Sequence, residues 1–232
     1  MNQPTFSVIL PFYRQQKYID DTIKKFQFQL DRMAETYEII AVNNGVANLT
    51  SETAVTTVNQ NPLIIRLDLK QAGWGRAVKA GLARAQGKFI CYTNTARTNP
   101  DELAALLKYA KISEDKIIKA IRVERTTQWR RWVSIFFNLE YKLILKTPIW
   151  DVNATPKIIP KKILDKITLF SDGDMIDGEL MHKCFLASIP IIEIPVKHLE
   201  PQGWKSTTNI YSALKMFWGI LELRFKNHHE KK

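Results

Sequence analysis

Four short apolar runs, rich in β-branched and aromatic residues, divide the first hundred residues at intervals of about thirty. They are Phe6–Leu10, Tyr37–Val42, Leu63–Leu67 and Phe89–Tyr92. The segments between them have helical spacing of apolar residues, so the order is strand, helix, strand, helix, strand, helix, strand. This alternation predicts an α/β fold with a parallel, doubly wound sheet.

The expected helices run from Tyr18 to Leu30, from Thr50 to Val58 and from Arg76 to Ala85. Polar or proline-containing breaks end the strands. Pro11 is expected to stop the first strand. Asn43-Asn44-Gly45 is expected to end the second, because Asn-Gly supplies the positive φ that a tight turn needs.

The stretch from Lys88 to Glu102 contains the most informative break. The apolar run Phe89–Tyr92 is followed by Thr93–Arg97, which cannot continue a buried strand, and Pro100 fits the first position of a new helix. In an open α/β sheet, ligands bind beyond the carboxyl ends of the strands. We therefore expect Thr93–Arg97 to face a ligand.

Composition indicates one domain and an anionic partner. A chain of 232 residues with 45% hydrophobic content can bury one sizeable core. The formal net charge of +11 favours phosphate, nucleic acid or an acidic membrane. Nucleic acid is disfavoured because the aromatic residues lie in helical apolar stripes and no binding motif for it occurs. Cys91 and Cys184 have apolar neighbours and no metal-ligand spacing, which indicates reduced core thiols.

The loops around these runs resemble a known family. SVILPFYRQQKYI, YEIIAVNNGVANLTSETA and QAGWGRAVKAGLARAQGKFICYTNTARTNPDEL are similar to the amino-terminal half of the family-two inverting glycosyltransferases. Later segments resemble the branch that transfers sugars to dolichyl or undecaprenyl phosphate: KAIRVER (119–125), DVNATPK (151–157), Ser171–Val196 and QGWKSTTN (202–209). The resemblance covers roughly the whole chain.

This resemblance implies the nucleotide-diphospho-sugar transferase (GT-A) fold, with a central, mostly parallel sheet flanked by helices. Residues 1–209 are expected to form the glycosyltransferase-like domain. Residues 210–232 are expected to form an amphipathic helix and a basic tail.

The resemblance places a nucleotide-sugar donor at the three polar loops. The expected donor-binding residues are Pro11, Tyr13, Gln15, Asn43, Asn44, Gly45, Thr93, Asn94 and Thr95. The family carries Glu, Asp-Asp and Asp-x-Asp in these loops, where the carboxylates grip the base and ribose and hold a divalent cation. Amides and hydroxyls replace such ligands poorly. No metal site is therefore expected, beyond weak binding of Mg²⁺ or Mn²⁺.

Arg97 replaces a family glutamine that helps to ligate the metal. An arginine is a permanent cation whose planar fork pairs well with phosphate oxygens. One hypothesis is that Arg97 stands in for the metal and neutralises the donor diphosphate. The alternative is that the loop has drifted and Arg97 points to solvent.

A basic cluster follows in the second half, and its family-like spacing suits a lipid-linked phosphate. The expected acceptor-binding residues are Lys119, Arg122, Arg125, Asp151, Asn153 and Lys205. A solvated run of charges is the alternative for the basic members. Asp151 could equally cap a turn.

Asp177 is the candidate catalytic carboxylate, together with Arg97. Asp177 and Glu179 belong to the only acidic cluster of the second half and are expected to begin a helix that closes the crevice. As first-turn acids they could equally compensate the helix dipole. A phosphate acceptor is already ionised near neutral pH, so charge neutralisation and alignment are required more than a strong base. His182 is expected to be a packing residue.

Two segments rich in aromatic residues, Trp129–Trp150 and Ile210–Phe225, carry interspersed Lys and Arg. They suit the headgroup boundary of a membrane, and the tail KNHHEKK adds attraction to anionic lipid. The alternative is that one helix packs on the core and the other seals a homo-oligomer. With no apolar run of about 18 residues and no signal-like start, the expected location is cytoplasmic, peripheral at the inner face of the cell membrane.

The leading function is a glycosyltransferase that moves a sugar from a nucleotide-sugar to a polyprenyl phosphate or similar lipid-linked acceptor. Its metal dependence is expected to be altered or lost. The alternative is an inactive pseudo-glycosyltransferase that serves as partner or regulator of an active transferase. A nucleic-acid-binding protein is the third and least favoured class.

Overall fold

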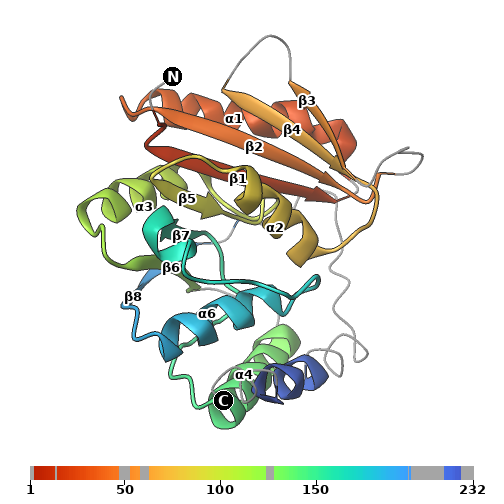
Figure 1. Ribbon diagram of the computed structural model, residues 1–232, viewed down its shortest axis with the longest axis vertical. Helices are drawn as coiled ribbons and strands as arrows, with labels where there is room; N and C mark the ends of the chain where they lie inside the picture. Colours follow the sequence, from red (N-terminus) through yellow and green to blue (C-terminus); the bar gives the residue numbers. More distant parts are fainter. Residues whose placement is uncertain are drawn as a thin grey trace.

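A mixed sheet of eight strands, in the order β3-β4-β2-β1-β5-β7-β6-β8, forms the centre of the molecule (Figure 1). The computed structural model describes residues 3–13, 15–46, 53–57, 63–123, 128–197, 199 and 217–225. The strands are β1 (Phe6–Tyr13), β2 (Tyr37–Asn44), β3 (Thr53–Thr57), β4 (Ile64–Leu69), β5 (Phe89–Tyr92), β6 (Ile117–Arg122), β7 (Lys157–Pro160) and β8 (Ile191–Val196).

Strand direction decides which loops meet. Four of the seven pairings between neighbouring strands are parallel, and β1, β2, β4 and β5 all run in the same direction. Their carboxyl ends therefore lie at one edge of the sheet, where ligands of α/β proteins bind. Strand β7 runs antiparallel to β5, with Lys157 opposite Tyr92. The first residue of β7 consequently lies at that same edge.

Helices cover both faces of the sheet. They are η1 (Gln16–Tyr18), α1 (Ile19–Asp31), α2 (Trp74–Arg84), α3 (Pro100–Ile112), α4 (Gln128–Leu145), α5 (Lys161–Leu164), α6 (Ile176–Leu186) and a helical segment at 217–225. Helix α3 begins as the sequence predicts, with Pro100 in its first turn and the Asn99 side chain accepting from the amide of Asp101 (2.9 Å).

Two hydrophobic cores lie on opposite faces of the sheet. Val8 packs with α1 and α3, whereas the next residue, Ile9, packs with α2, α4 and α6. Side chains alternate between faces along a strand, so a strand covered on both sides must be apolar throughout. This is why β1 and β2 read as continuous apolar runs. Cys91 and Cys184 are free and buried, as expected.

The order of strands and helices predicted for the first hundred residues is confirmed, with one exception. The helix expected from Thr50 to Val58 is wrong, because Thr53–Thr57 form β3, antiparallel to β4. The run Thr-Ala-Val-Thr-Thr is rich in β-branched residues, which lose side-chain freedom in a helix and favour a strand.

Pro11 does not stop the first strand, because β1 continues to Tyr13. The carbonyl of Ile9 faces β5, where it accepts from the amide of Thr93 (3.3 Å). By the two-residue repeat, the amide position of Pro11 faces the same side, and the pairing of β1 with β5 ends at Ile9. The missing N–H of proline is therefore not required by a neighbour.

The segment 217–225 lies beside α4 at one end of the long axis (Figure 1). Arg224 donates to the carbonyl of Ile144 at the end of α4 (2.8 Å). Ile220 and Leu223 are buried in the same core as Tyr141. The rest of the expected carboxyl-terminal helix and the basic tail lie outside the described residues.

The amino terminus of α2 packs tightly against the turn that leads to α6. A Cβ atom on Gly75 would lie 2.3 Å from the carbonyl oxygen of Ser171, whereas one on Gly173 would meet nothing within 4 Å. We predict that Gly75→Ala lowers the free energy of unfolding by about 1–3 kcal/mol, because backbone must shift to make room. Urea titration measures the loss. Gly173→Ala is the matched control, and equal losses in the two variants would contradict the tight packing.

Candidate functional site

The predicted donor loops meet at the carboxyl edge of the sheet. Asn44 lies opposite Tyr13 in the register of β2 and β1. The hydroxyl of Thr95, after β5, donates to the carbonyl of Pro11 (2.9 Å) and lies 3.3 Å from the side-chain oxygen of Gln15. The fold therefore brings the three loops together.

The second loop is shaped by its two asparagines. Asn44 donates to the carbonyl of Gly73 and accepts from its amide, both at 3.1 Å. Asn43 donates to Asp68 on β4 (2.8 Å). A carboxylate at position 44 could not donate to the Gly73 carbonyl. Gly45 has a φ of 78°, the left-handed conformation that the Asn-Gly turn predicts. The amides thus fit local structure that aspartates would not.

The third loop also satisfies its own polar groups. The hydroxyls of Thr93 and Thr98 share a hydrogen bond of 2.5 Å. The side chain of Asn94 accepts from the amide of Ala96 (3.2 Å). Arg97 is partly exposed, and its backbone joins the loop to Leu199, whose amide donates to the Arg97 carbonyl (2.8 Å). The predicted direction of the Arg97 side chain toward a donor stays a prediction.

These residues do not fit a divalent cation. Across the described ranges, no group of three or more His, Cys, Asp or Glu side chains could hold a metal ion. The loop 93–97 contains no carboxylate, its two threonines, Thr93 and Thr95, are already hydrogen-bonded, and Arg97 adds a positive charge. Mg²⁺ in proteins is usually held through one or two carboxylates together with water and substrate phosphates.

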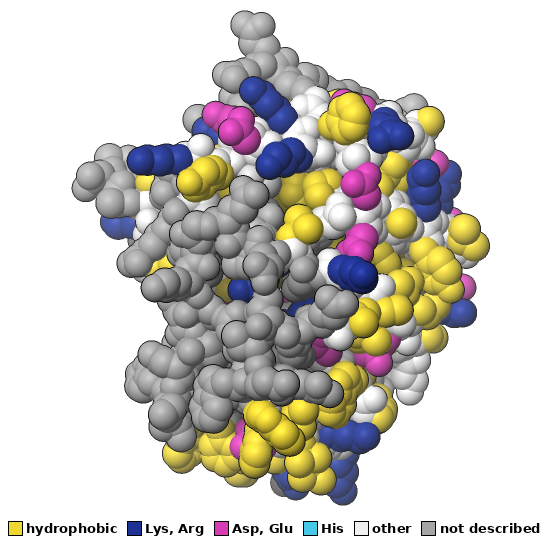
Figure 2. Space-filling model, turned by 180° about the vertical axis from the view of Figure 1, so that it is seen from behind, with side chains coloured by type: hydrophobic (Ala, Val, Ile, Leu, Met, Phe, Trp, Pro, Cys, Tyr) yellow, Lys and Arg dark blue, Asp and Glu magenta, His cyan; other side chains and the backbone are white. Residues whose placement is uncertain are grey.

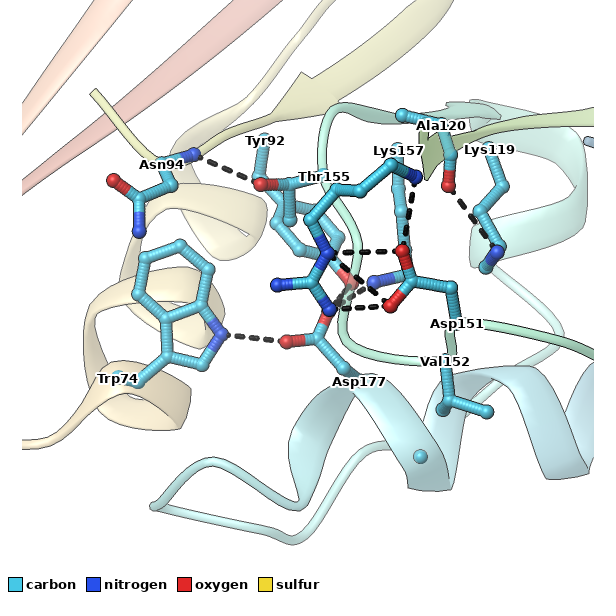
Figure 3. A network of polar contacts seen from close by, with 12 residues as sticks. Trp74, Tyr92, Asn94, Lys119, Ala120, Asp151, Val152, Thr155, Lys157 and Asp177 are labelled. Atoms are coloured by element: carbon cyan, nitrogen blue, oxygen red, sulfur yellow. Dashed lines mark hydrogen bonds and ion pairs between the residues drawn. The ribbon is translucent and has the colours of Figure 1, made fainter. Parts of the chain in front are cut away.

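Asp177 is the centre of a buried polar network (Figure 3). This residue, in the first turn of α6, accepts hydrogen bonds from the hydroxyl of Tyr92 (2.8 Å), the indole of Trp74 (2.8 Å) and the ammonium of Lys157. Burial lowers the pKa of Lys157, and Asp177 opposes that effect. Burial and Asp177 together raise the pKa of Tyr92. The three donors come from β5, α2 and β7, so this carboxylate ties both halves of the fold together.

Lys119 is fully buried between β7 and β8. Its ammonium donates to Glu193 (2.7 Å) and to the carbonyls of Trp150 (2.7 Å) and Ala120 (3.2 Å), which uses all three N–H groups. Burial lowers the pKa of Lys119 to about 8, although Glu193 favours the charged form. As placed, Lys119 supports the cluster from within. Its predicted contact with an acceptor is not seen and stays a prediction.

Arg122, at the end of β6, pairs with Asp151. The guanidinium donates through Nε (2.9 Å) and Nη2, and the backbone amide of Arg122 donates to the same carboxylate (2.9 Å). The backbone of Asp151 also forms a turn, in which its carbonyl accepts from the amide of Ala154 (2.8 Å). Asn153 lies in that turn, and its buried side-chain oxygen has no hydrogen-bond partner among the described residues. Arg125 and Lys205 lie outside the described residues.

The acidic cluster has divided roles. Glu179 accepts from the amides of Phe170 and Ser171, both at 2.8 Å, and holds the turn before α6. Burial alone would raise the pKa of Glu179, but these backbone donors lower it overall. Asp172 pairs at the surface with Arg76 and Lys79. His182 is buried, with Nδ1 2.7 Å from the hydroxyl of Thr147, as a packing histidine would be.

Sequence reasoning missed three of the network's members: Trp74, Tyr92 and Lys157. A usable signal existed for Lys157, because it is a charged residue at the head of the apolar run Ile158–Pro160 and would need a buried counter-ion there. Trp74 and Tyr92 carried no comparable signal. They are aromatic residues in apolar segments, where packing is the ordinary expectation.

A mixed sheet with a parallel centre and polar loops at its carboxyl edge is consistent with the GT-A class of nucleotide-sugar transferase folds, and solved structures of that class match it. The chain superimposes on glucosyl-3-phosphoglycerate synthase from Mycobacterium tuberculosis, solved with Mn²⁺, UDP and phosphoglyceric acid, with a TM-score of 0.68 at 12% identity, over 95% of this chain and 77% of that one. Mannosyl-3-phosphoglycerate synthase from Rubrobacter xylanophilus gives a TM-score of 0.68 at 12% identity, over 98% and 75% of the two chains. The expected fold class is confirmed.

The model of glycosyl transferase family 2 matches residues 7–168, and the chain belongs to this family. A curated relative, the undecaprenyl-phosphate 4-deoxy-4-formamido-L-arabinose transferase of Pseudomonas aeruginosa PAO1, is 20% identical over 90% of this chain and 61% of its own length. The protein of that name in Edwardsiella ictaluri is 22% identical over 93% and 66%. The chain thus spans about three fifths of the length of the Pseudomonas aeruginosa relative.

We predict that Asp177→Asn lowers the free energy of unfolding by about 3–5 kcal/mol near neutral pH, because Lys157 is left buried without its counter-ion. The loss should shrink as pH rises. Asp177 raises the pKa of Lys157, so its removal lowers that pKa further below the ordinary value. The unfolded chain then holds a proton that the folded variant has released, and stability increases toward the usual lysine pKa of about 10.4.

Urea titrations of wild type and variant across this pH range check the prediction. Asp165→Asn is the matched control, because Asp165 pairs with Lys161 at the surface and its loss should change stability by less than about 0.5 kcal/mol. A loss in Asp177→Asn that does not vary with pH would contradict a buried, charged Lys157.

Proposed function

We propose that this chain transfers a sugar from a nucleotide-sugar donor to a polyprenyl phosphate or a similar lipid-linked phosphate. The observation that carries the proposal is a direct contact between the two predicted halves of the site. The amide of Asn94, in the donor loop, donates to the hydroxyl of Thr155 in the acceptor segment (3.2 Å) (Figure 3). Family membership and the named activities of the curated relatives support it.

The reaction needs alignment and charge neutralisation more than a base. An ionised phosphate oxygen of the acceptor would attack the anomeric carbon, and the bond to the donor diphosphate would break with its electron pair on the leaving nucleotide. An acceptor that is already ionised has no proton to give up. Asp177, bonded to three donors, suits a fixed electrostatic role better than proton transfer. Its predicted catalytic role is retained in that form.

Arg97 is proposed to supply positive charge to the donor diphosphate. The loop 93–97 has no carboxylate with which to hold Mg²⁺ or Mn²⁺, and Arg97 is its partly exposed cation. The solved glucosyl-3-phosphoglycerate synthase binds Mn²⁺ together with UDP. Dependence on such a metal is proposed to be weakened or lost in this chain. The other donor residues, Tyr13 and Gln15 among them, would line the same edge.

An inactive pseudo-glycosyltransferase is the second candidate. It is favoured by the way the donor loops satisfy their own polar groups, through the Thr93–Thr98 and Asn44–Gly73 hydrogen bonds. Such a protein would keep the acceptor half and act as a partner of an active transferase. Donor binding distinguishes the two candidates.

The chain is further proposed to act while bound to the cytoplasmic face of the cell membrane. Helix α4 buries Phe137, Tyr141 and Leu145 in the core. Its opposite side exposes an apolar stripe at helical spacing, which we call the α4 stripe: Trp132, Phe136, Leu139 and Leu143. Core packing has no use for a second apolar side. A helix at a membrane surface buries such a second apolar side in lipid.

Neighbouring residues extend this surface. Trp218 and Phe225 of the segment 217–225 are exposed next to α4, and Lys142, Lys146 and Arg224 are exposed in the same region. Figure 2 shows hydrophobic side chains gathered at this end of the molecule, with Lys and Arg beside them. Apolar residues bordered by cations suit an anionic lipid surface. No helix in the described ranges has the length and apolarity needed to cross a bilayer.

We predict turnover of a nucleotide-sugar and a polyprenyl phosphate that persists in a metal chelator. Arg97→Gln should lower turnover by about tenfold or more, because a charge-assisted contact with the diphosphate is lost. A panel of nucleotide-sugars, assayed in chelator and in Mn²⁺, measures this. Arg84→Gln, an exposed arginine at the end of α2, is the control. Turnover that requires Mn²⁺ would contradict the role of Arg97, and absence of donor binding would favour the pseudoenzyme.

We predict that Phe136→Ser with Leu143→Ser weakens binding to phosphatidylglycerol vesicles by about tenfold or more, because buried apolar area is lost. Co-sedimentation measures the bound fraction. Phe28→Ser on α1 is the matched control, since Phe28 is 61% exposed and Phe136 is 65% exposed. Unchanged vesicle binding would contradict the membrane surface. A dimer that becomes a monomer in the variant would assign the stripe to an oligomer interface.

A further inference from the structure

The buried charges behind the acceptor segment are balanced, and this limits which cation can meet a ligand. Lys119 pairs with Glu193, Lys157 with Asp177, and Arg122 with Asp151. The side chains of Lys119 and Lys157 are completely buried, whereas that of Arg122 is 23% exposed. Of these three cations, only Arg122 has an exposed part of its side chain that a ligand can contact.

The guanidinium of Arg122 has one edge in use and one edge open. Its Nε and Nη2 groups donate to Asp151, which occupies the edge nearest the aliphatic chain. Within the described part of the structure, no hydrogen bond uses Nη1. A guanidinium has five N–H donors in a planar fork, so the end formed by Nη1 and Nη2 remains able to bind two phosphate oxygens.

Asp151 is built to hold this arrangement. Its carboxylate is 2% exposed and receives both the guanidinium and the backbone amide of Arg122, so it fixes that side chain relative to the end of β6. Its φ of 43° is a conformation that non-glycine residues seldom adopt, although aspartate and asparagine tolerate it better than most. An arginine held at two points has lost the rotational freedom that would otherwise be lost on binding.

We propose that Asp151 is a positioning residue that aims the open end of the Arg122 fork at the phosphate of the lipid acceptor. The inference rests on the proposed function and makes it more specific: Asp151 does not touch the acceptor, and it acts through Arg122. The place of Arg122 favours the acceptor over the donor, because β7 separates β6 from β5 and its donor loop. Helix α4, which carries the α4 stripe, begins at Gln128, shortly after Arg122.

The test is a double-mutant cycle on binding of a short isoprenyl phosphate, read by calorimetry with the full chain. Asp151→Asn keeps a residue that tolerates positive φ, and it should weaken binding by about tenfold. Arg122→Gln should weaken binding at least as much. The double variant should bind no more weakly than Arg122→Gln alone, because the guanidinium that Asp151 orients is then absent. Losses that multiply would overturn the inference, since Asp151 would then act independently of Arg122.

Further binding measurements distinguish the lipid acceptor from other phosphates, and they distinguish failure of this inference from failure of the proposed function. Inorganic phosphate should show the same ranking of variants with weaker affinity, whereas a nucleoside diphosphate should bind all variants equally; selective loss of the nucleotide would overturn the assignment to the acceptor. Asp172→Asn, which weakens the surface pairs with Arg76 and Lys79, is the matched control. Isoprenyl phosphate binding without turnover would contradict the proposed transferase activity but would not contradict the role of Asp151. Failure of the wild type to bind isoprenyl phosphate would overturn both.

Asp151→Glu covers the case in which Asp151→Asn does not fold. It keeps the negative charge next to Arg122 but moves the carboxylate outward by one methylene. A role in positioning predicts that Asp151→Glu also weakens isoprenyl phosphate binding by several-fold, because contacts of this kind depend on placement within about 0.5 Å. Undiminished binding in Asp151→Glu would mean that charge balance alone matters, and it would overturn the inference.

Discussion

The buried ion pair between Lys157 and Asp177 is the interaction on which the rest of the site depends. Removing two charges from water is costly, and geometry must compensate for it. Here the carboxylate also receives Tyr92 and Trp74, so its oxygens have partners from three separate elements. Because Trp74 begins α2 and Lys157 begins β7, a single buried carboxylate links elements from the two halves of the chain.

Around that centre, the chain replaces carboxylates with neutral groups on one side and retains cations on the other. The side chain of Asn44 donates to the carbonyl of Gly73 and accepts from its amide, and the hydroxyls of Thr93 and Thr98 share a hydrogen bond. The loops are therefore shaped by their own amides and hydroxyls. Loops of this kind hold their shape without an ion. On the other side, Arg122 is a cation held in a fixed place by Asp151.

Local pattern was sufficient to predict the parallel centre of the sheet, because Phe6–Leu10, Tyr37–Val42 and Phe89–Tyr92 are apolar runs whose type and length leave little choice. It failed at Thr53–Thr57, where an available strand edge and β-branched residues outweighed helical spacing. The burial of Lys119 could not be foreseen either. That burial depends on β6 lying between β7 and β8, a strand order that no local pattern encodes. The contacts of Asp177 are likewise long-range, so its importance was inferable but its partners were not.

Helix α4 has apolar residues on both of its long sides, and the membrane binding proposed from them would change how the protein meets its acceptor. A chain bound to a lipid surface in the proposed way, through Trp132, Phe136 and Leu143, would search for a lipid-borne acceptor by diffusion in two dimensions. Encounter then depends on the number of acceptor molecules per unit area of membrane. The amount of acceptor in the whole cell volume becomes irrelevant to the rate.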